Sequence, residues 1–243
     1  MTYPLLTAQH LLNARVIERD PRGIKVLQLP NGDYLKVFRL RHRFSWSRFQ
    51  GYAQRFSNNA SSLAALGIPT VRVINCYQVK NGRLLDYPLS AHSHSEPIQD
   101  IAPLTQTYAV HYAPLAGETL KILLDQQQLD TNHVKQLGVF IAELHEKGIH
   151  FRSLHLGNIV LTPEGKMGLI DIADMKIYPW SLWFGTRLRS FRHLTRYARI
   201  NVSFGDTNWS MLVNSYIEHA ALTVSQAGIL KKKMQHFLLH PPH

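Results

Sequence analysis

Cysteine is nearly absent from this sequence: among its 243 residues, Cys76 is the only one. An internal disulfide and a zinc cluster built on cysteines are therefore excluded, and such usage is typical of a reducing compartment. Cys76 lies in the apolar run 71–79, and this position predicts a buried strand residue.

Long apolar runs are also missing. No uninterrupted run approaches the roughly 18 to 20 residues that a membrane-spanning helix needs. The N-terminus lacks the basic region and the small-residue cleavage site of a secretory signal. We therefore expect a cytoplasmic protein, whose contact with a membrane would be peripheral and at its inner face. With 45% hydrophobic residues, the chain can bury a substantial core.

Acidic residues are scarce and unevenly spread. The chain has 27 Lys and Arg against 16 Asp and Glu, a formal net charge of +11, and no acid in 34–85 or 175–205. In the second stretch, arginines recur between 187 and 199 as they would along one side of a helix. Such charge attracts phosphates, nucleic acid or an anionic membrane surface, although each stretch alone equally fits a solubilising face. Zinc-finger spacing, RNP-type strands and a convincing helix-turn-helix are all absent.

The first third of the chain alternates apolar and polar residues. The runs 14–20, 23–29 and 33–40 are separated by turn residues and predict an antiparallel three-stranded meander. Helical spacing over 46–67 predicts a helix that ends at Gly67 and Pro69. Two further strand-like runs follow within 70–89.

The polar segment 90–100 predicts a surface loop. His92 and His94 could face one side of an extended chain there, but no third metal ligand is evident. Further on, Thr131 can cap a helix that ends at Gly148. Its apolar stripe consists of Val134, Leu137, Phe140, Ile141 and Leu144. The segment 145–150 departs from the zinc-protease pattern HExxH by one residue, so we reject that interpretation.

A hairpin is predicted over 159–174, before mostly helical sequence and a basic tail, 231–236 and 240–243, that we expect to be frayed. The run HFRSLHLGN (150–158), the strand-like 159–161 and GLID (168–171) together resemble the catalytic and metal-binding loops of the protein-kinase-like superfamily. More narrowly, the chain resembles the bacterial lipopolysaccharide core (Kdo and heptose) kinases. That resemblance implies an α+β, two-lobed fold: an antiparallel β-rich N-lobe over 1–110, a larger helical C-lobe over 111–243, and ATP bound between them.

The hairpin has a chemical consequence of its own. Asn158 precedes its first strand and Asp171 follows its second, so the 162–165 turn would bring both side chains to one end. Amide and carboxylate oxygens suit magnesium. By the resemblance, Asn158 and Asp171 match the family's two metal ligands. The structural alternative makes Asp171 a helix cap and Asn158 a turn residue.

The resemblance also assigns the nucleotide contacts. Lys36 matches the third-strand lysine that holds the ATP phosphates, although a lysine in an alternating strand is more often solvated. Tyr112 and Ala113 lie in the stretch 110–119, which looks like the hinge that receives adenine.

Three departures from the family pattern stand out. Ser153 occupies the position of the catalytic aspartate, and a hydroxyl is a far weaker base than a carboxylate. The expected helix has no acid to pair with Lys36; Asn58 and Asn59 lie near that place. The first hairpin offers a single glycine, Gly23, where a glycine-rich phosphate loop is expected.

Two neighbours of Ser153 offer partial substitutes. His155 could act as a base, because an imidazole titrates near neutral pH, or could be a structural hydrogen-bonding residue. Arg152 could hold an anionic group of the substrate.

These residues support three hypotheses. The first is a magnesium- and ATP-dependent phosphotransferase with a non-standard active site, acting on a sugar of an anionic glycolipid. The second is a pseudokinase that regulates a protein partner. The third, a basic nucleic-acid-binding module, rests on charge alone.

Overall fold

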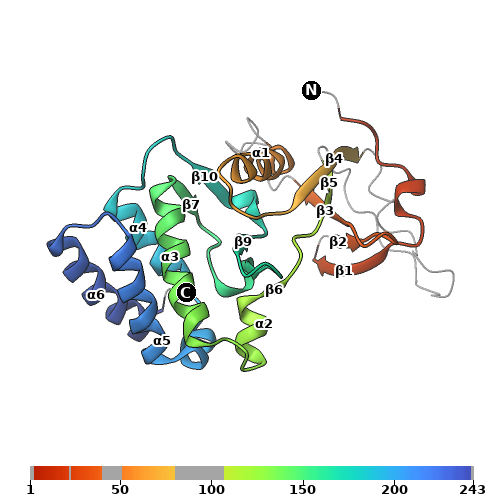
Figure 1. The fold of residues 1–243 in the computed structure, drawn as a ribbon. Coiled ribbons are helices and arrows are strands. Elements are labelled where there is room, and N and C mark those ends of the chain that lie inside the picture. Colours follow the sequence, from red (N-terminus) through yellow and green to blue (C-terminus); the bar gives the residue numbers. More distant parts are fainter. Residues whose placement is uncertain (1–2, 22, 40–50, 80–106, 242–243) are drawn as a thin grey trace. The chain divides into compact units, whose positions relative to one another are not determined.

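The computed structural model describes residues 3–21, 23–39, 51–79 and 107–241. The chain divides into two compact units (Figure 1). Unit 1 contains Met1–Ala60 and Val71–Pro114, and unit 2 contains Ser61–Thr70 and Leu115–His243. Unit 1 thus ends at 114, close to the expected boundary at 110, but the short segment 61–70 belongs to unit 2.

Unit 1 is built on one antiparallel sheet with strand order β1-β2-β3-β5-β4. Its elements are the short 3-10 helix η1 (Ala8–Leu11), β1 (Arg15–Asp20), β2 (Gly23–Gln28), β3 (Tyr34–Arg39), β4 (Arg72–Val79), β5 (Thr107–Ala113) and most of α1 (Tyr52–Ala65). The predicted meander and the predicted helix are confirmed. The second strand-like run, the first residues of the expected helix (46–50) and the His92/His94 loop lie outside the described residues.

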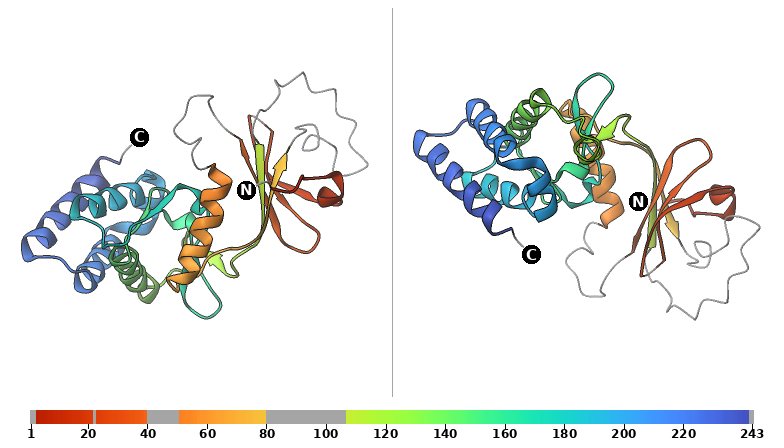
Figure 2. Two further views of the ribbon diagram at one scale, coloured as in Figure 1. Left: turned by 90° about the horizontal axis from the view of Figure 1, so that it is seen from above. Right: turned by 90° about the horizontal axis from the view of Figure 1, so that it is seen from below.

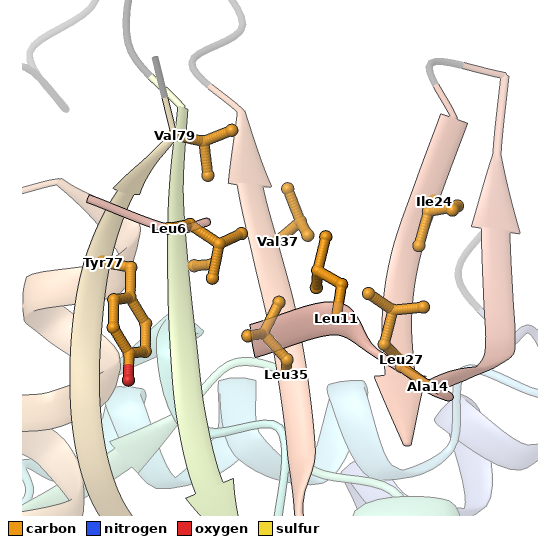
Figure 3. Close-up of a cluster of buried hydrophobic side chains, with 10 residues drawn as sticks. Leu6, Leu11, Ala14, Ile24, Leu27, Leu35, Val37, Tyr77 and Val79 are labelled. Atoms are coloured by element: carbon orange, nitrogen blue, oxygen red, sulfur yellow. The ribbon is translucent and has the colours of Figure 1, made fainter. Parts of the chain in front are cut away.

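One face of this sheet is covered by the N-terminal segment. Leu35 and Val37 of β3 point toward Leu6 and Leu11, and the cluster is nearly inaccessible to solvent (Figure 3). The segment is fixed by its backbone, because Leu6 N donates to Gln78 O at 3.0 Å and Gln78 N donates to Pro4 O at 2.9 Å. This packing explains the alternation along β3, in which every second side chain enters the cluster.

The opposite face of β3 carries Lys36 and Phe38. Phe56 of α1 packs there, with its ring centroid 5.8 Å from that of Phe38 and 5.3 Å from that of Tyr112. Cys76 is buried in β4 as a free thiol, as expected. Burial raises the pKa of this thiol above its usual value, so the thiolate is disfavoured.

Unit 2 combines helices with short strands. Its elements are β6 (Glu118–Thr119), α2 (Leu120–Asp125), α3 (Thr131–Glu146), β7 (Ile149–Phe151), the 3-10 helix η4 (Leu156–Asn158), β8 (Ile159–Leu161), β9 (Met167–Leu169), the 3-10 helix η5 (Ile172–Asp174), β10 (Met175–Ile177), α4 (Phe184–Leu194), α5 (Ala198–His219) and α6 (Val224–Leu239). Figure 2 shows α3, α4, α5 and α6 gathered in one bundle, in which α5 packs on α3 and α6 packs on α4 and α5. The chain is therefore α+β.

Two details differ from expectation. The cap of α3 is Asp130 instead of Thr131: its carboxylate accepts from the backbone N of His133 at 2.8 Å, which satisfies a free donor of the first turn. The segment 231–236, expected to be a frayed tail, belongs to α6.

The helix α5 is bent at Gly205, whose φ of 77° is unfavourable for residues with a side chain. No helix in the described part of the chain is long and apolar enough to span a membrane.

A buried histidine makes the stability of the helical bundle depend on pH. His145 of α3 lies 2.9 Å from the hydroxyl of Tyr216 in α5, and burial, aided by Arg187 and His150, lowers the pKa of His145 to about 3. The unfolded chain binds a proton at this histidine below about pH 6.5, whereas the folded chain does not until about pH 3. The free energy of unfolding should therefore decrease as the pH is lowered through this window, by roughly 2 kcal/mol between pH 7 and pH 5.

Urea unfolding at a series of pH values measures this slope. His145→Gln should reduce the slope by about one proton, whereas the exposed His240→Gln should leave it unchanged. Equal slopes in the wild type and His145→Gln would show that another group is responsible.

Candidate functional site

The predicted hairpin forms, and it brings Asn158 and Asp171 to the same end. In β8 and β9, Ile159 pairs with Leu169, and the turn is closed by Thr162 N donating to Lys166 O at 2.8 Å. Beyond the last pair, Ile170 N donates to Asn158 O at 3.0 Å. Asn158 and Asp171 are therefore neighbours across the open end of the hairpin.

A close backbone contact holds this hairpin in unit 2. Leu169 N donates to Pro69 O at 2.9 Å, and Thr70 Oγ1 donates to Leu169 O at 2.7 Å. A Cβ at Gly168 would lie 2.5 Å from Pro69 O, so only glycine allows this approach. The segment 69–70 thus fixes β9, which leads directly to Asp171.

Asn158 has a defined orientation. The residue is buried, and its Nδ2 donates to the carbonyl oxygen of Ser153 at 2.9 Å. Because this bond holds the nitrogen toward the loop, Oδ1 is directed away from it. Oδ1 is thus the atom of Asn158 that could bind a cation.

Asp171 adopts an uncommon backbone conformation. Its φ of 54° and ψ of 43° lie in the left-handed region, which non-glycine residues occupy uncommonly, asparagine and aspartate more often than most. Asp171 is the N-cap residue of η5, as the structural alternative expects, but its side chain makes no capping hydrogen bond there. Residues held in such conformations cluster at active sites and ligand clamps.

The side chain of His155 makes a hydrogen bond with the backbone at the start of η4. Its Nδ1 accepts from the backbone N of Gly157 at 3.1 Å, and its ring meets that of Tyr197 edge-on at 5.2 Å. Burial lowers the pKa of His155, while Asp171 opposes the shift and Arg196 adds to it. The neutral ring with Nδ1 as acceptor carries its proton on Nε2. No lone pair is then free to take a proton, so this geometry does not support a general base.

Ser153 and Arg152 also make contacts that stabilise this loop. The carbonyl of half-buried Ser153 orients Asn158. The guanidinium of Arg152 pairs with the carboxylate of Asp174, and Arg152 N donates to Asp174 O at 3.2 Å. An anionic substrate group at Arg152 would therefore share the guanidinium with this carboxylate.

In unit 1, Lys36 lies against aromatic rings. Its Nζ is 5.8 Å from the ring centroid of Phe38 and 6.0 Å from that of Phe56, at the outer limit of a cation–π contact. The helix α1 contains no acid, and Asn58 is exposed and accepts from Gln54 on the same helix. Lys36 is buried, however, and is not the solvated lysine that its alternating strand suggests.

Tyr112 and Ala113 end the central strand β5. Tyr112 pairs with Tyr34 of β3 and with Val73 of β4, and its ring stacks on Tyr34 at 5.9 Å. Ala113 pairs only with Arg72 of β4, because the ladder to β3 stops one residue earlier. On the side that faces β3, the backbone of Ala113 therefore lies beyond the end of the β3–β5 ladder.

Magnesium fits the donor set in unit 2. The oxygen ligands offered are the amide of Asn158 and the carboxylate of Asp171, and magnesium keeps several waters or phosphate oxygens beside one or two protein ligands. Within the described ranges, no group of three or more His, Cys, Asp or Glu could hold a metal. A site for a metal that demands a complete protein cage therefore has no candidate there.

A hollow of about 430 Å³ lies elsewhere in unit 2. It is lined by the segment 67–69, by α3 and by the hairpin turn at 165–167, and none of the predicted site residues lines it. This hollow was not expected from the sequence. Among the residues that line it, Glu143 and Lys166 are the charged ones.

Comparison of the chain with protein-family models and with curated proteins finds no match. Local geometry therefore carries the functional argument.

Proposed function

We propose that this chain is a kinase-fold protein, related to the lipopolysaccharide core kinases, that binds Mg-ATP and transfers phosphate to a sugar of an anionic glycolipid. The observation that carries the proposal is the meeting of Asn158 and Asp171 at the open end of the hairpin, with Asp171 held in the left-handed region. Oxygen donors from two chain segments meeting at one point suit a magnesium ion.

Each residue would have a limited task. Magnesium, when bound, neutralises charge on the phosphate oxygens. Asn158 would offer Oδ1 and Asp171 its carboxylate to that ion, while His155 and Ser153 keep the loop in shape. Lys36 would contact the phosphates, and the backbone at Tyr112 and Ala113 would contact the adenine.

A second candidate function, a pseudokinase, is favoured by specific observations. Ser153 stands where the resemblance places the catalytic aspartate, and the imidazole of His155 has its acceptor nitrogen occupied. The loss of a positioned general base costs about a hundred- to ten-thousand-fold in rate. A protein of this kind would bind nucleotide or serve as a nucleotide-free scaffold, and it would regulate a protein partner by its conformation without transferring phosphate.

Thermal unfolding with ATP, with and without magnesium, tests nucleotide binding. We expect ATP to raise the melting temperature, and magnesium to increase that rise, because ligands that bind only the folded state stabilise it. A chain whose melting temperature is unchanged by Mg-ATP would refute the phosphotransferase and would leave the pseudokinase only as a nucleotide-free scaffold. Steep salt-sensitive binding of random nucleic acid in the same preparation would favour the third hypothesis.

A transfer assay separates the first two functions. With a core oligosaccharide extract present, the phosphotransferase should consume ATP and label the extract, whereas the pseudokinase should do neither. Ser153→Asp restores a carboxylate at that position, and it should increase transfer if the site is an impaired kinase site.

A further inference from the structure

The acid-free stretch 175–205 folds into β10, α4 and the first part of α5, and its arginines do not share one role. Arg187 points inward and pairs with Glu146 at 2.7 Å. Arg189, Arg192 and Arg196 are exposed and recur at intervals of three and four residues. Arg189 and Arg192 therefore lie on one side of α4, and Arg196 follows just after the end of the helix.

Two neighbouring strands add further cations beside α4. In the pairing of β7 with β10, Lys176 lies opposite His150, and Arg152 follows β7 directly. The helix α4 packs against β7. Basic residues that are distant in the sequence are thus gathered on one part of unit 2.

Burial and the neighbouring positive charges lower the pKa values of two histidines, His150 and His193. Burial lowers the pKa of His150, and Arg189, Arg152 and Lys176 lower it further, against Asp174. Burial likewise lowers the pKa of His193, aided by Arg196, His150 and Arg152, again against Asp174. Asp174 acts on both rings, and its carboxylate already pairs with Arg152.

One polar atom in this group has no partner. Nε2 of His150 is buried and makes no hydrogen bond to the described residues. A buried polar group without a partner is unfavourable. An anion bound at the exposed cations beside this ring would balance the surrounding positive charge.

We propose that His150, Arg152, Lys176, Arg189 and His193, the basic cluster, bind a phosphate group carried by the acceptor. The inference rests on the proposed function, since it assigns a substrate class to the same site. His155 connects the two regions, because it accepts from Gly157 N beside Asn158 and its ring contacts that of Tyr197. The preceding residue, Arg196, has its guanidinium 2.8 Å from Nδ1 of His193. The acceptor would thus be a phosphorylated sugar or lipid held beside the metal ligands.

Calorimetric titration with inorganic phosphate and with sulfate, without nucleotide or magnesium, tests the cluster directly. The wild type should bind both anions at one site. Arg189→Gln and Lys176→Gln should each weaken binding by about tenfold or more, because each removes a charged donor. Asp174→Asn should strengthen it, since it removes the competing carboxylate. The matched control is Lys232→Gln, at an exposed position of α6.

Proton uptake provides a second readout. Sulfate keeps its charge between about pH 8 and pH 6, so protons taken up on binding belong to the protein. A bound anion stabilises the charged forms of His150 and His193, and raises their pKa values from the lowered values of the free protein. Sulfate affinity should therefore increase as pH falls through this range, and less so in His150→Gln.

The possible outcomes separate this inference from the proposed function. Absence of saturable phosphate and sulfate binding, or equal weakening in Arg189→Gln and Lys232→Gln, would overturn the basic cluster while Mg-ATP stabilisation stands. Displacement of phosphate by Mg-ATP would also overturn it, because the cluster would then belong to the nucleotide site. Saturable binding of glucose 6-phosphate or of phosphatidic acid vesicles, sensitive to Arg189→Gln, would support it and identify a soluble or a lipid acceptor, respectively.

Discussion

Replacing Asp171 by asparagine is expected to abolish the additional stabilisation that magnesium gives to the ATP complex. The substitution removes the one carboxylate of the predicted metal pair, while asparagine tolerates the left-handed backbone at this position. Weaker perturbations, in residues that only orient a metal ligand, already reduce affinity about ten- to hundredfold. We therefore expect at least about a hundredfold loss of magnesium affinity in the nucleotide complex, measured by titrating magnesium at saturating ATP.

The matched control is Asp125→Asn, because Asp125 is an exposed acid of α2 that pairs with Lys121 at 2.6 Å. It should leave the magnesium titration unchanged and the melting temperature nearly so, since exposed ion pairs contribute little. If Asp171→Asn retained the wild-type magnesium dependence, the assignment of Asp171 as a metal ligand would be wrong, and the proposed nucleotide site would lose its main support.

The parts of the fold that the sequence predicted depend on local signals. Alternation along 14–40, helical spacing over 46–67 and the turn at 162–165 each act within a few residues. The described residues of all three regions form the predicted strands, helix and turn. The same is true of the meeting of Asn158 and Asp171, because a tight hairpin fixes which residues face each other.

The parts that the sequence missed depend on contacts between distant segments. Phe56 of α1 reaches Lys36 across the sheet face, and the pairing of β7 with β10 puts Lys176 opposite His150. The acid-free stretch 175–205 was a signal for the basic cluster, but charge alone did not distinguish inward Arg187 from exposed Arg189. The tautomer of His155 depends on the backbone N of Gly157, which spacing does not show.

Arg187→Met is expected to destabilise unit 2 by about 3 kcal/mol, the lower end of the range for breaking a buried ion pair. The guanidinium is almost fully buried; Nε donates to Leu182 O at 2.7 Å and Nη1 to Glu146 Oε1 at 2.7 Å. It holds the pKa of Glu146 below its usual value, mainly through this hydrogen bond. Methionine would fill much of the volume but leave Leu182 O without its donor. Because Glu146 is partly exposed, water can compensate some of the loss.

Urea unfolding of Arg187→Met should be compared with Arg192→Met, which removes an exposed arginine from the same helix and should change stability by less than about 0.5 kcal/mol. The double variant Arg187→Met, Glu146→Gln should recover part of the loss, because it no longer leaves an unpaired carboxylate. Similar stabilities for Arg187→Met and Arg192→Met would mean that the inward arginine is dispensable to the bundle. The division between inward Arg187 and the exposed arginines beside the basic cluster would then have no energetic basis.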